Sequence, residues 1–170
     1  DHAKAGNLNH AISRTHGEII VIFDADFIPT RNFLKRTVGF FQDENVALVQ
    51  TPQSFYNPDP IARNLGLENV VTPEEEVFYR QIQPIKDGAG SVVCAGTSFL
   101  VRRRALEATG CFVTESLSED YFTGIRLAAK GFRLVYLDEK LSAGLAADSI
   151  ADHAAQRLRW ARGTLQAFFI

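Results

Sequence analysis

The stretch that decides the fold is GEIIVIFDADFIPTRNF, residues 17–33. Its apolar run, residues 19–23, leads directly into two acids, Asp24 and Asp26. A short apolar run bounded by Gly17 and an acidic pair predicts a β-strand that is covered on both faces. Two carboxylates two residues apart at the end of such a strand can turn toward the same point. We therefore expect a functional group of side chains at this strand end.

Helices and strands are predicted to alternate outward from this stretch. Apolar spacing and breakers predict helices at residues 4–14, 31–41 (starting near Pro29), 61–83 with a break at Pro73, 119–130 and 150–169. Strands are predicted at residues 18–23, 46–52, 132–138 and 141–147, with a further strand after the glycine-rich loop in residues 87–103. This pattern indicates an α/β fold, and 170 residues suit a single domain with one sizeable core.

The acidic pair alone has three interpretations. It forms a solvated turn, or it binds a divalent cation, since hard carboxylate oxygens suit Mg²⁺ or Mn²⁺. In the third, Asp24 is the nucleophile of a metal-dependent phosphohydrolase and Asp26 its acid/base. That class places a small hydroxyl residue two positions after the second acid, where this sequence has Ile28. Residues further along the chain must decide.

A second acidic motif is LSEDYFTG, residues 117–124. It places Glu119 and Asp120 at a helix start with Ser118 as a plausible cap, and a helix N-terminus favours an ionised carboxylate. One interpretation is simply a capped helix. The other is a general base that takes the proton from an attacking sugar hydroxyl in an inverting transfer.

The third motif is QRLRW, residues 156–160, in a strongly helical stretch. Gln156, Arg159 and Trp160 are spaced i, i+3 and i+4 and so share one helix face. Arginine grips phosphate oxygens, and tryptophan offers a flat surface and one N–H donor to a sugar ring. The alternative is a core tryptophan with an arginine stacked over it.

Composition excludes some classes. A net charge of −2 and scattered Lys/Arg provide no basic face for nucleic acid, and the dense run VRRRAL, residues 101–106, is typical of a solvated helix start. Two cysteines are too few for a disulfide framework, and no run approaches the roughly 18 apolar residues of a membrane span. The chain has no Met and stops inside an apolar helical pattern, so we expect an internal fragment of a longer protein, with exposed apolar surface prone to artefactual self-association.

Five motifs in series carry a resemblance: HAKAGN (2–7), FDAD (23–26), QTP (50–52), SED (118–120) and QRLRW (156–160). Together they resemble the processive family-2 glycosyltransferases, and most closely the catalytic domain of bacterial cellulose synthases. The resemblance spans essentially the whole chain. It implies a partial nucleotide-sugar transferase fold of the GT-A type, with a mixed, mostly parallel sheet and helices on both faces. The N-terminal nucleotide-binding strands of that fold lie upstream of these residues.

The resemblance also implies roles for the acids. Asp24 and Asp26 match the D-x-D motif that holds a metal, Mg²⁺ or Mn²⁺, on the donor diphosphate, with Asp26 as the main ligand. Lys4 matches a position that contacts the donor nucleotide. Asp120 matches the last residue of the T-E-D motif, the catalytic base. Here that motif reads S-E-D, a mild change because both hydroxyls can cap a helix.

Further residues match the family's substrate contacts. Gln156, Arg159 and Trp160 match Q-x-x-R-W, which holds the diphosphate and the terminal sugar of the growing polymer. Cys94, in VVCAGTS, matches a segment near the acceptor at the channel mouth, although the family's F-F-C-G-S is reduced to V-V-C-A-G. These positions are the implied substrate-binding residues.

The implied function is inverting transfer of a sugar, with glucose favoured, from a UDP-sugar to the non-reducing end of a growing β-glucan. The parent protein would act at the cytoplasmic face of the inner membrane and carry its own transmembrane channel, with no nucleic-acid partner. The fragment alone is expected to be inactive. Chitin- or hyaluronan-type synthesis, phosphohydrolysis through Asp24 and Asp26, and a non-catalytic carbohydrate-binding or assembly module remain alternatives.

Overall fold

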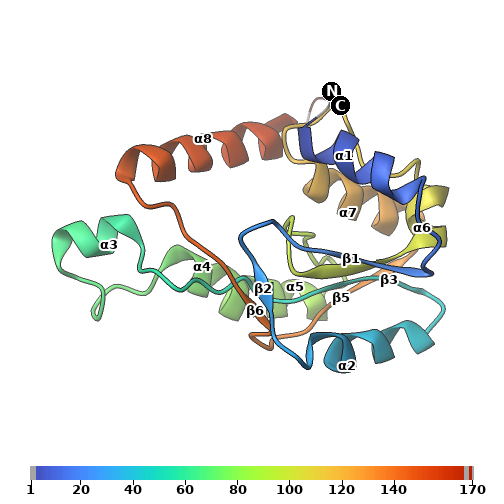
Figure 1. Ribbon diagram of the computed structural model, residues 1–170, viewed down its shortest axis with the longest axis horizontal. Coiled ribbons are helices and arrows are strands. Elements are labelled where there is room, and N and C mark those ends of the chain that lie inside the picture. Colours follow the sequence, from blue (N-terminus) through green and yellow to red (C-terminus); the bar gives the residue numbers. More distant parts are fainter. Residues whose placement is uncertain (1–2, 167–168, 170) are drawn as a thin grey trace.

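The computed structural model describes residues 3–166 and 169 and has the predicted α/β architecture. Its main sheet has the strand order β1-β4-β3-β5, with helices on both faces (Figure 1). The strands are β1 (Ile19–Ile22), β3 (Val46–Gln50), β4 (Phe99–Arg102) and β5 (Arg133–Tyr136). The strand predicted from the opening stretch is therefore present.

The sheet is mixed, as expected, but its pairings differ from a mostly parallel sheet. β3 pairs with β5 in parallel, whereas β4 runs antiparallel to both β1 and β3. Three strands of the described sheet thus share a direction, while two of its three pairings are antiparallel. An apolar run looks the same whichever way its strand points, so the sequence pattern could not reveal the direction of β4.

The prediction that β1 is covered on both faces was wrong in part. β1 lies at the edge of the sheet, where Ile22 is buried but Val21 is 37% exposed. Its four residues pair with β4 alone, in the register Ile19↔Arg102 to Ile22↔Phe99. The edge strand is therefore only partly buried, and Asp26, shortly after its end, is exposed to solvent.

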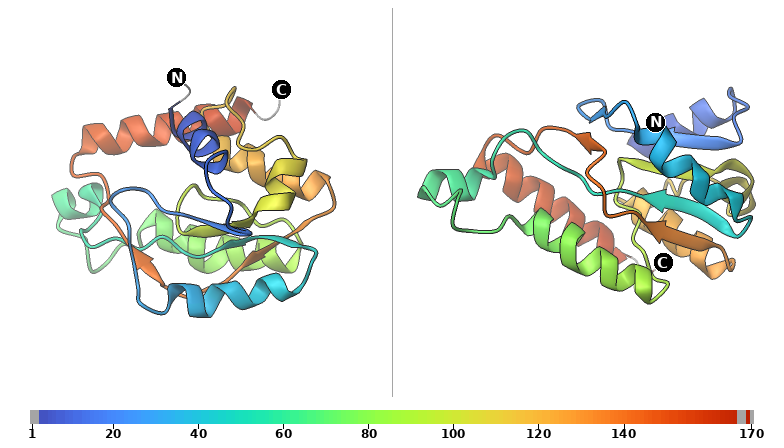
Figure 2. Two further views of the ribbon diagram at one scale, coloured as in Figure 1. Left: turned by 45° about the vertical axis from the view of Figure 1, so that its right-hand side comes forward. Right: turned by 90° about the horizontal axis from the view of Figure 1, so that it is seen from below.

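Two hydrophobic clusters pack against the two faces of the sheet. Figure 2 shows the helices that cover these faces. One cluster lies under α1 (Ala3–Ile12), α6 (Arg103–Ala108) and α7 (Glu119–Ala129). The other lies against α2 (Phe33–Thr37) and the following 3₁₀ helix η1 (Val38–Gln42). Neighbouring strand residues alternate between the clusters, as Leu48 and Val49 do, because successive side chains point to opposite faces.

The helix predicted to start near Pro29 begins later. Ile28–Pro29 instead forms the short strand β2, which pairs with β6 (Ser142–Ala143). The Thr30 N–H donates to the Leu141 carbonyl 2.8 Å away, which extends this contact. Pairing with a distant segment overrode the helix-start signal of the proline.

The predicted 61–83 helix is divided into four pieces. They are α3 (Pro60–Leu65), α4 (Glu74–Val77), the π-helical turn η2 (Phe78–Ile82) and α5 (Gln83–Gly88). α3 ends at Gly66, which has a φ of 65° and so adopts the left-handed conformation that stops a helix. The break expected at Pro73 is present, but it begins earlier, at Gly66, and extends to Pro73, the N-cap of α4.

Arg102 corrects the interpretation of residues 101–106 as solvated. α6 does begin there, but the Arg102 side chain is 1% exposed. Its guanidinium donates to the carbonyl oxygens of Val46, Phe41 and Asp43 and pairs with Glu18 at 3.0 Å. These acceptors satisfy a buried charge that the sequence pattern does not reveal.

The last helix, α8 (Ile150–Gln166), carries the QRLRW motif. Ala167 and Phe168, at the predicted end of this helix, lie outside the described residues, as do Ile170 and His2 of the HAKAGN motif. Among the helices that the structure describes, none combines the length and apolar character needed to cross a membrane.

Candidate active site

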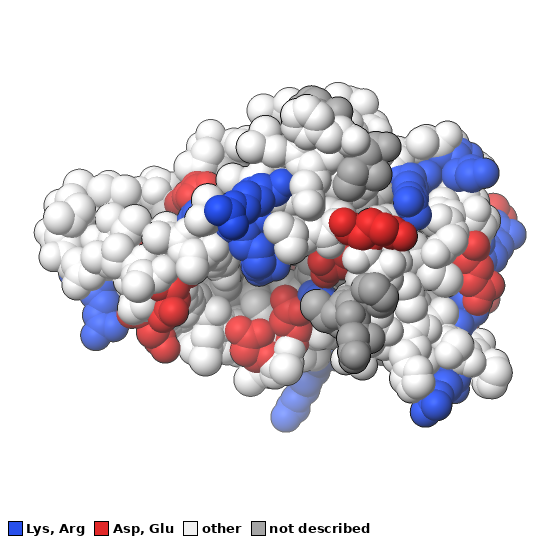
Figure 3. Space-filling model, turned by 90° about the horizontal axis from the view of Figure 1, so that it is seen from above, with Lys and Arg blue, Asp and Glu red and all other residues white. Residues whose placement is uncertain are grey.

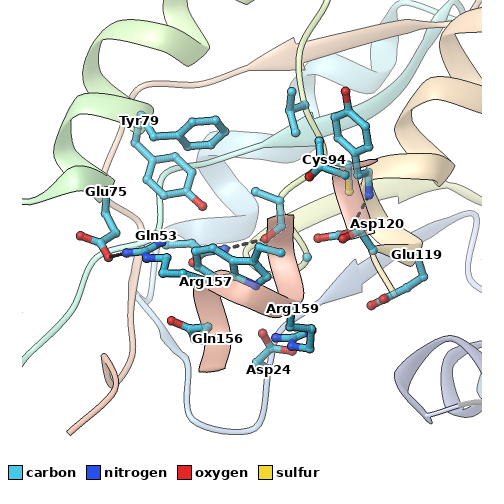
Figure 4. Close-up of a pocket in the computed structure, with 18 of the residues that line it drawn as sticks. Asp24, Gln53, Glu75, Tyr79, Cys94, Glu119, Asp120, Gln156, Arg157 and Arg159 are labelled. Carbon is cyan, nitrogen blue, oxygen red and sulfur yellow. Dashed lines mark hydrogen bonds and ion pairs between the residues drawn. The ribbon is translucent and has the colours of Figure 1, made fainter. Parts of the chain in front are cut away.

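A cavity of about 650 Å³ lies between α8, the first turn of α7, α1 and the end of β1. The predicted site residues from all these elements line it, and Figure 4 shows several of them converging. They are Lys4, Asp24, Asp26, Cys94, Asp120, Gln156, Arg159 and Trp160. Charged side chains of both signs gather near a hollow on the face seen in Figure 3.

The two acids after β1 have different surroundings. Asp24 forms an ion pair with Lys4 of α1, whose ammonium group also donates to the Gly96 carbonyl. The Asp24 N–H donates to Thr97 Oγ1 at 2.9 Å, so its backbone is held as well. Asp26, in the turn that follows, is exposed and lines the cavity. One carboxylate is thus fixed to the protein while the other faces open space.

Asp120 lies in the first turn of α7 and is partly buried. Burial, reinforced by the neighbouring charge of Glu119, raises its pKa from 3.8 to about 6. Gly96 permits this position: with a φ of 85°, it would place an added Cβ atom 2.7 Å from Asp120 Oδ2. A carboxylate whose pKa lies near neutrality suits proton transfer, because it is ionised at pH 7 and still a competent base.

The prediction that the Ser118 hydroxyl caps α7 was wrong, although Ser118 does precede the helix. Within the described chain its hydroxyl makes no capping hydrogen bond to α7. The side chain instead faces Gly163 of α8, where an added Cβ atom would lie 2.0 Å from Ser118 Oγ. Leu117 N–H also donates to Gln166 Oε1 at 3.1 Å. Close packing on a glycine thus brings α8 against the start of α7, so that both helices border the same cavity.

Three glutamines hold the loop that carries Cys94 and Gly96. Gln50 accepts from the Ala95 N–H and donates to the Thr97 carbonyl, both at 2.8 Å. Gln83 exchanges two hydrogen bonds with the backbone of Val93, and Gln53 donates to the Ala95 carbonyl at 2.6 Å. Apart from Gln50 in the QTP motif, no sequence signal marks these residues, because a buried glutamine is recognised only by its distant partners.

Cys94 borders the cavity but is only 1% exposed, packed beneath Gly124 of α7. Burial raises the pKa of its thiol well above the usual value, so the group stays protonated. Cys94 and Cys111 are both free. Cys94 therefore forms part of the cavity wall, and its place near an acceptor channel stays a prediction.

The i, i+3, i+4 spacing in α8 places its three motif residues on one helix face, as predicted. Gln156, Arg159 and Trp160 all line the cavity, and Trp160 is partly exposed rather than in the core. The arginine that stacks on Trp160 is Arg157, with its guanidinium carbon 4.6 Å from the ring centroid. Sequence reasoning missed Arg157, and also Glu75 and Tyr79, which line the opposite wall (Figure 4). Glu75 and Tyr79 lie close to Arg157 only because of how residues 59–88 fold.

The family profile described as "Glycosyltransferase like family 2" matches residues 1–163. The chain belongs to this glycosyltransferase family. It is 46% identical over 167 residues to "Cellulose synthase 2" of Novacetimonas hansenii, covering 98% of this chain and 10% of that protein. It is 45% identical over 168 residues to "Cellulose synthase 1 catalytic subunit (UDP-forming)" of Komagataeibacter xylinus, covering 98% of this chain and 23% of that protein.

Solved structures confirm the GT-A type of fold. A mannosyltransferase from Pyrobaculum calidifontis, in complex with GDP-Man and Mn²⁺, is similar with a TM-score of 0.69 and 24% identity, over 99% of this chain and 43% of that one. Glucosyl-3-phosphoglycerate synthase from Mycobacterium tuberculosis, with Mn²⁺ and UDP-glucose, gives 0.51 and 18%, over 89% and 49%. The chain thus spans under half of these structures, and about a tenth to a quarter of the curated relatives.

Proposed function

We propose that the chain is the donor- and acceptor-binding part of a longer, UDP-forming polysaccharide synthase of the cellulose-synthase type. The observation that carries this proposal is the single cavity shared by the acidic pair, by Asp120 and by the Gln156, Arg159 and Trp160 face. These are the groups that an inverting sugar transfer needs: a diphosphate site, a base and a sugar platform. The identity to cellulose synthases over nearly the whole chain supports glucose as the sugar.

The acidic pair fits a divalent cation. Asp26 offers an exposed carboxylate to the cavity, and Asp24, whose Oδ1 is engaged by Lys4, offers its second oxygen. Hard oxygen donors that leave room for phosphate oxygens suit Mg²⁺ or Mn²⁺. A bound ion would offset the negative charge that develops on the departing diphosphate. Lys4, held beside Asp24, keeps that carboxylate oriented and adds a positive charge near the donor.

Asp120 is the proposed base. It takes the proton from the acceptor hydroxyl as that oxygen attacks the anomeric carbon, while the bond from this carbon to the UDP oxygen breaks. Attack from the face opposite UDP inverts the configuration. The partial burial that raises the pKa of Asp120 to about 6 makes proton uptake easier than for an exposed aspartate.

The α8 residues are proposed to bind both substrates. Arg159, exposed on the cavity side, neutralises the diphosphate, and Gln156 supplies amide hydrogen bonds. Trp160 presents its ring to the terminal sugar of the polymer. Cys94, in the cavity wall, limits the space available to the acceptor. Together they set the orientation in which the acceptor hydroxyl reaches Asp120.

The setting is proposed from the similarity to cellulose synthases, of which the chain spans about a tenth to a quarter. The longer protein would act at the cytoplasmic face of the inner membrane, with transmembrane helices forming a channel for the polymer. The isolated chain is expected to lack synthase activity, because the rest of the donor pocket would come from outside it. Self-association of the isolated chain would not be evidence of a native assembly.

The proposal is tested by calorimetry of UDP with Mn²⁺ on the longest protein that contains this chain. Asp26→Ala should weaken Mn²⁺-dependent UDP binding at least tenfold, while the exposed-site control Glu68→Gln leaves it unchanged. Equal binding by the Asp26 variant would refute the metal role. Mg²⁺-dependent turnover of p-nitrophenyl phosphate, lost in the same variant, would favour the phosphohydrolase instead.

A further inference from the structure

Arg157 lies at the centre of a group of contacts that the proposed function does not use. Its Nη2 forms an ion pair with Glu75, and its Nε lies 3.3 Å from Glu74 Oε2. The same Nε donates to His153 Nε2 at 3.2 Å, one helical turn earlier on α8. The guanidinium also stacks on Trp160. Figure 4 shows Arg157 reaching from α8 to Glu75 across the cavity wall.

The acceptors around Arg157 also have metal-ligand chemistry. Asp59, Glu75 and His153 bring one ligand atom each within 4.8 Å of one another. The Arg157 guanidinium, however, already donates to Glu75 and to His153. Asp59 is engaged too, because its Oδ1 accepts the Ile61 and Ala62 N–H groups at the start of α3. Arg157 therefore supplies the positive charge beside Glu75 and His153, while Asp59 Oδ2 lies 3.5 Å from His153 Nε2.

The partners of Arg157 are well placed to fix it. The side chains of Arg157 and Glu75 are 20% and 16% exposed, so their ion pair is screened less than a surface pair. Glu75 belongs to α4, whereas Arg157 and Trp160 belong to α8. An arginine anchored in this way cannot rotate away from the indole without breaking the bridge between the two helices.

We infer that Arg157 is a positioning residue, which, anchored by Glu75 and His153, fixes the ring plane of Trp160 in the cavity. The guanidinium covers one face of the indole and leaves the other for a sugar ring. Cation–π attraction between the guanidinium and the indole ring stabilises this orientation. The part that concerns acceptor binding rests on the proposed function; the fixing of the ring does not.

The test of ring fixing uses fluorescence, since Trp160 is the single tryptophan of the 170-residue chain. Acrylamide quenching and emission anisotropy would be measured for Arg157→Lys and Glu75→Gln. A lysine keeps the charge but cannot stack and donate to both anchors at once. We expect quenching to rise about twofold and anisotropy to fall in both variants. Arg162→Lys, an exposed α8 position, is the matched control and should change neither.

Circular dichroism melts accompany these measurements. If Arg157→Lys alone unfolds the chain, Glu75→Gln decides, because it leaves α8 intact. Unchanged quenching in a folded variant would overturn the inference. Unfolding of both variants would also overturn it, since the cluster would then serve only stability.

The second readout is the transfer reaction of the longer protein with a soluble β-linked oligosaccharide acceptor. Both variants should raise the apparent KM for the acceptor roughly three- to tenfold with little change in kcat, as expected from losing a stacking contact. If fluorescence changes but the acceptor KM does not, the ring is fixed by Arg157 and the acceptor role of Trp160 is wrong. A fall in kcat alone would refute a role in acceptor positioning.

Discussion

Replacing Asp120 by Asn should make the protein more stable at neutral pH while removing its proposed catalytic base. The pKa of Asp120 is raised from 3.8 to about 6, chiefly by burial. A carboxyl group whose folded-state pKa is raised costs no stability when protonated and destabilises the fold as pH rises through that value. The gap corresponds to at most about 3 kcal/mol above pH 7. Asparagine stays neutral. Its side-chain oxygen can still accept the hydrogen bond that the Tyr121 N–H donates to Asp120 Oδ1 at 2.8 Å.

The diagnostic quantity is the pH dependence of the difference between variant and wild type. Linkage predicts that the advantage of Asp120→Asn in free energy of unfolding grows by about 2 kcal/mol between pH 4.5 and pH 8. Urea unfolding at several pH values measures it, and using differences cancels any pH-independent effect of the substitution. Glu68→Gln, an exposed carboxylate, should show no such growth. Parallel curves for Asp120→Asn and wild type would refute the assignment of a buried, perturbed carboxyl group.

Three further predictions concern the same cavity. Gly163→Ala places a Cβ atom against Ser118 Oγ, so it should lower the free energy of unfolding in urea by about 1–3 kcal/mol. Adding Ser118→Gly should restore part of this loss, whereas stability equal to wild type in Gly163→Ala would contradict the packing. Gly96→Ala forces a side chain toward Asp120 Oδ2 at a φ of 85°, and should reduce transfer at least tenfold in a UDP-release assay, an effect that unchanged release would disprove. The transfer rate of the longer protein should rise with pH through about 6, because the base must be ionised; a rate that stays level across that range would argue against Asp120.

The sequence was informative where chemistry lies at the ends of regular elements. Asp24 and Asp26 follow a strand, Asp120 starts a helix, and one helix face carries Arg159 and Trp160; all of them line the one cavity. Periodicity predicts such elements because it reports which residues are buried. Their convergence could be expected from the order of the motifs in the family they resemble. Their roles remain predictions.

Features that depend on distant partners could not be predicted. The direction of β4 is absent from an apolar pattern, and Arg102 reads as solvated until the carbonyls around it are known. Gln53 and Gln83 resemble ordinary polar residues, yet they hold the loop beside Asp120. Arg157 falls between two motif positions, and its anchor Glu75 comes from a distant segment that was predicted as a helix with a break at Pro73. Apart from the direction of β4, each case is a polar contact with a distant partner, whose energy depends on tertiary packing rather than on local pattern.

The central claim is that this cavity transfers glucose from UDP-glucose with Asp120 as the base. The most direct measurement is incorporation of radiolabelled sugar into polymer by the longest protein that contains the chain, with UDP-glucose and UDP-GlcNAc compared. We predict incorporation from UDP-glucose that is lost in Asp120→Asn and kept in Glu68→Gln, with UDP binding unchanged in both. Incorporation from UDP-GlcNAc alone would contradict the choice of sugar, and polymer synthesis by Asp120→Asn at the wild-type rate would contradict the mechanism.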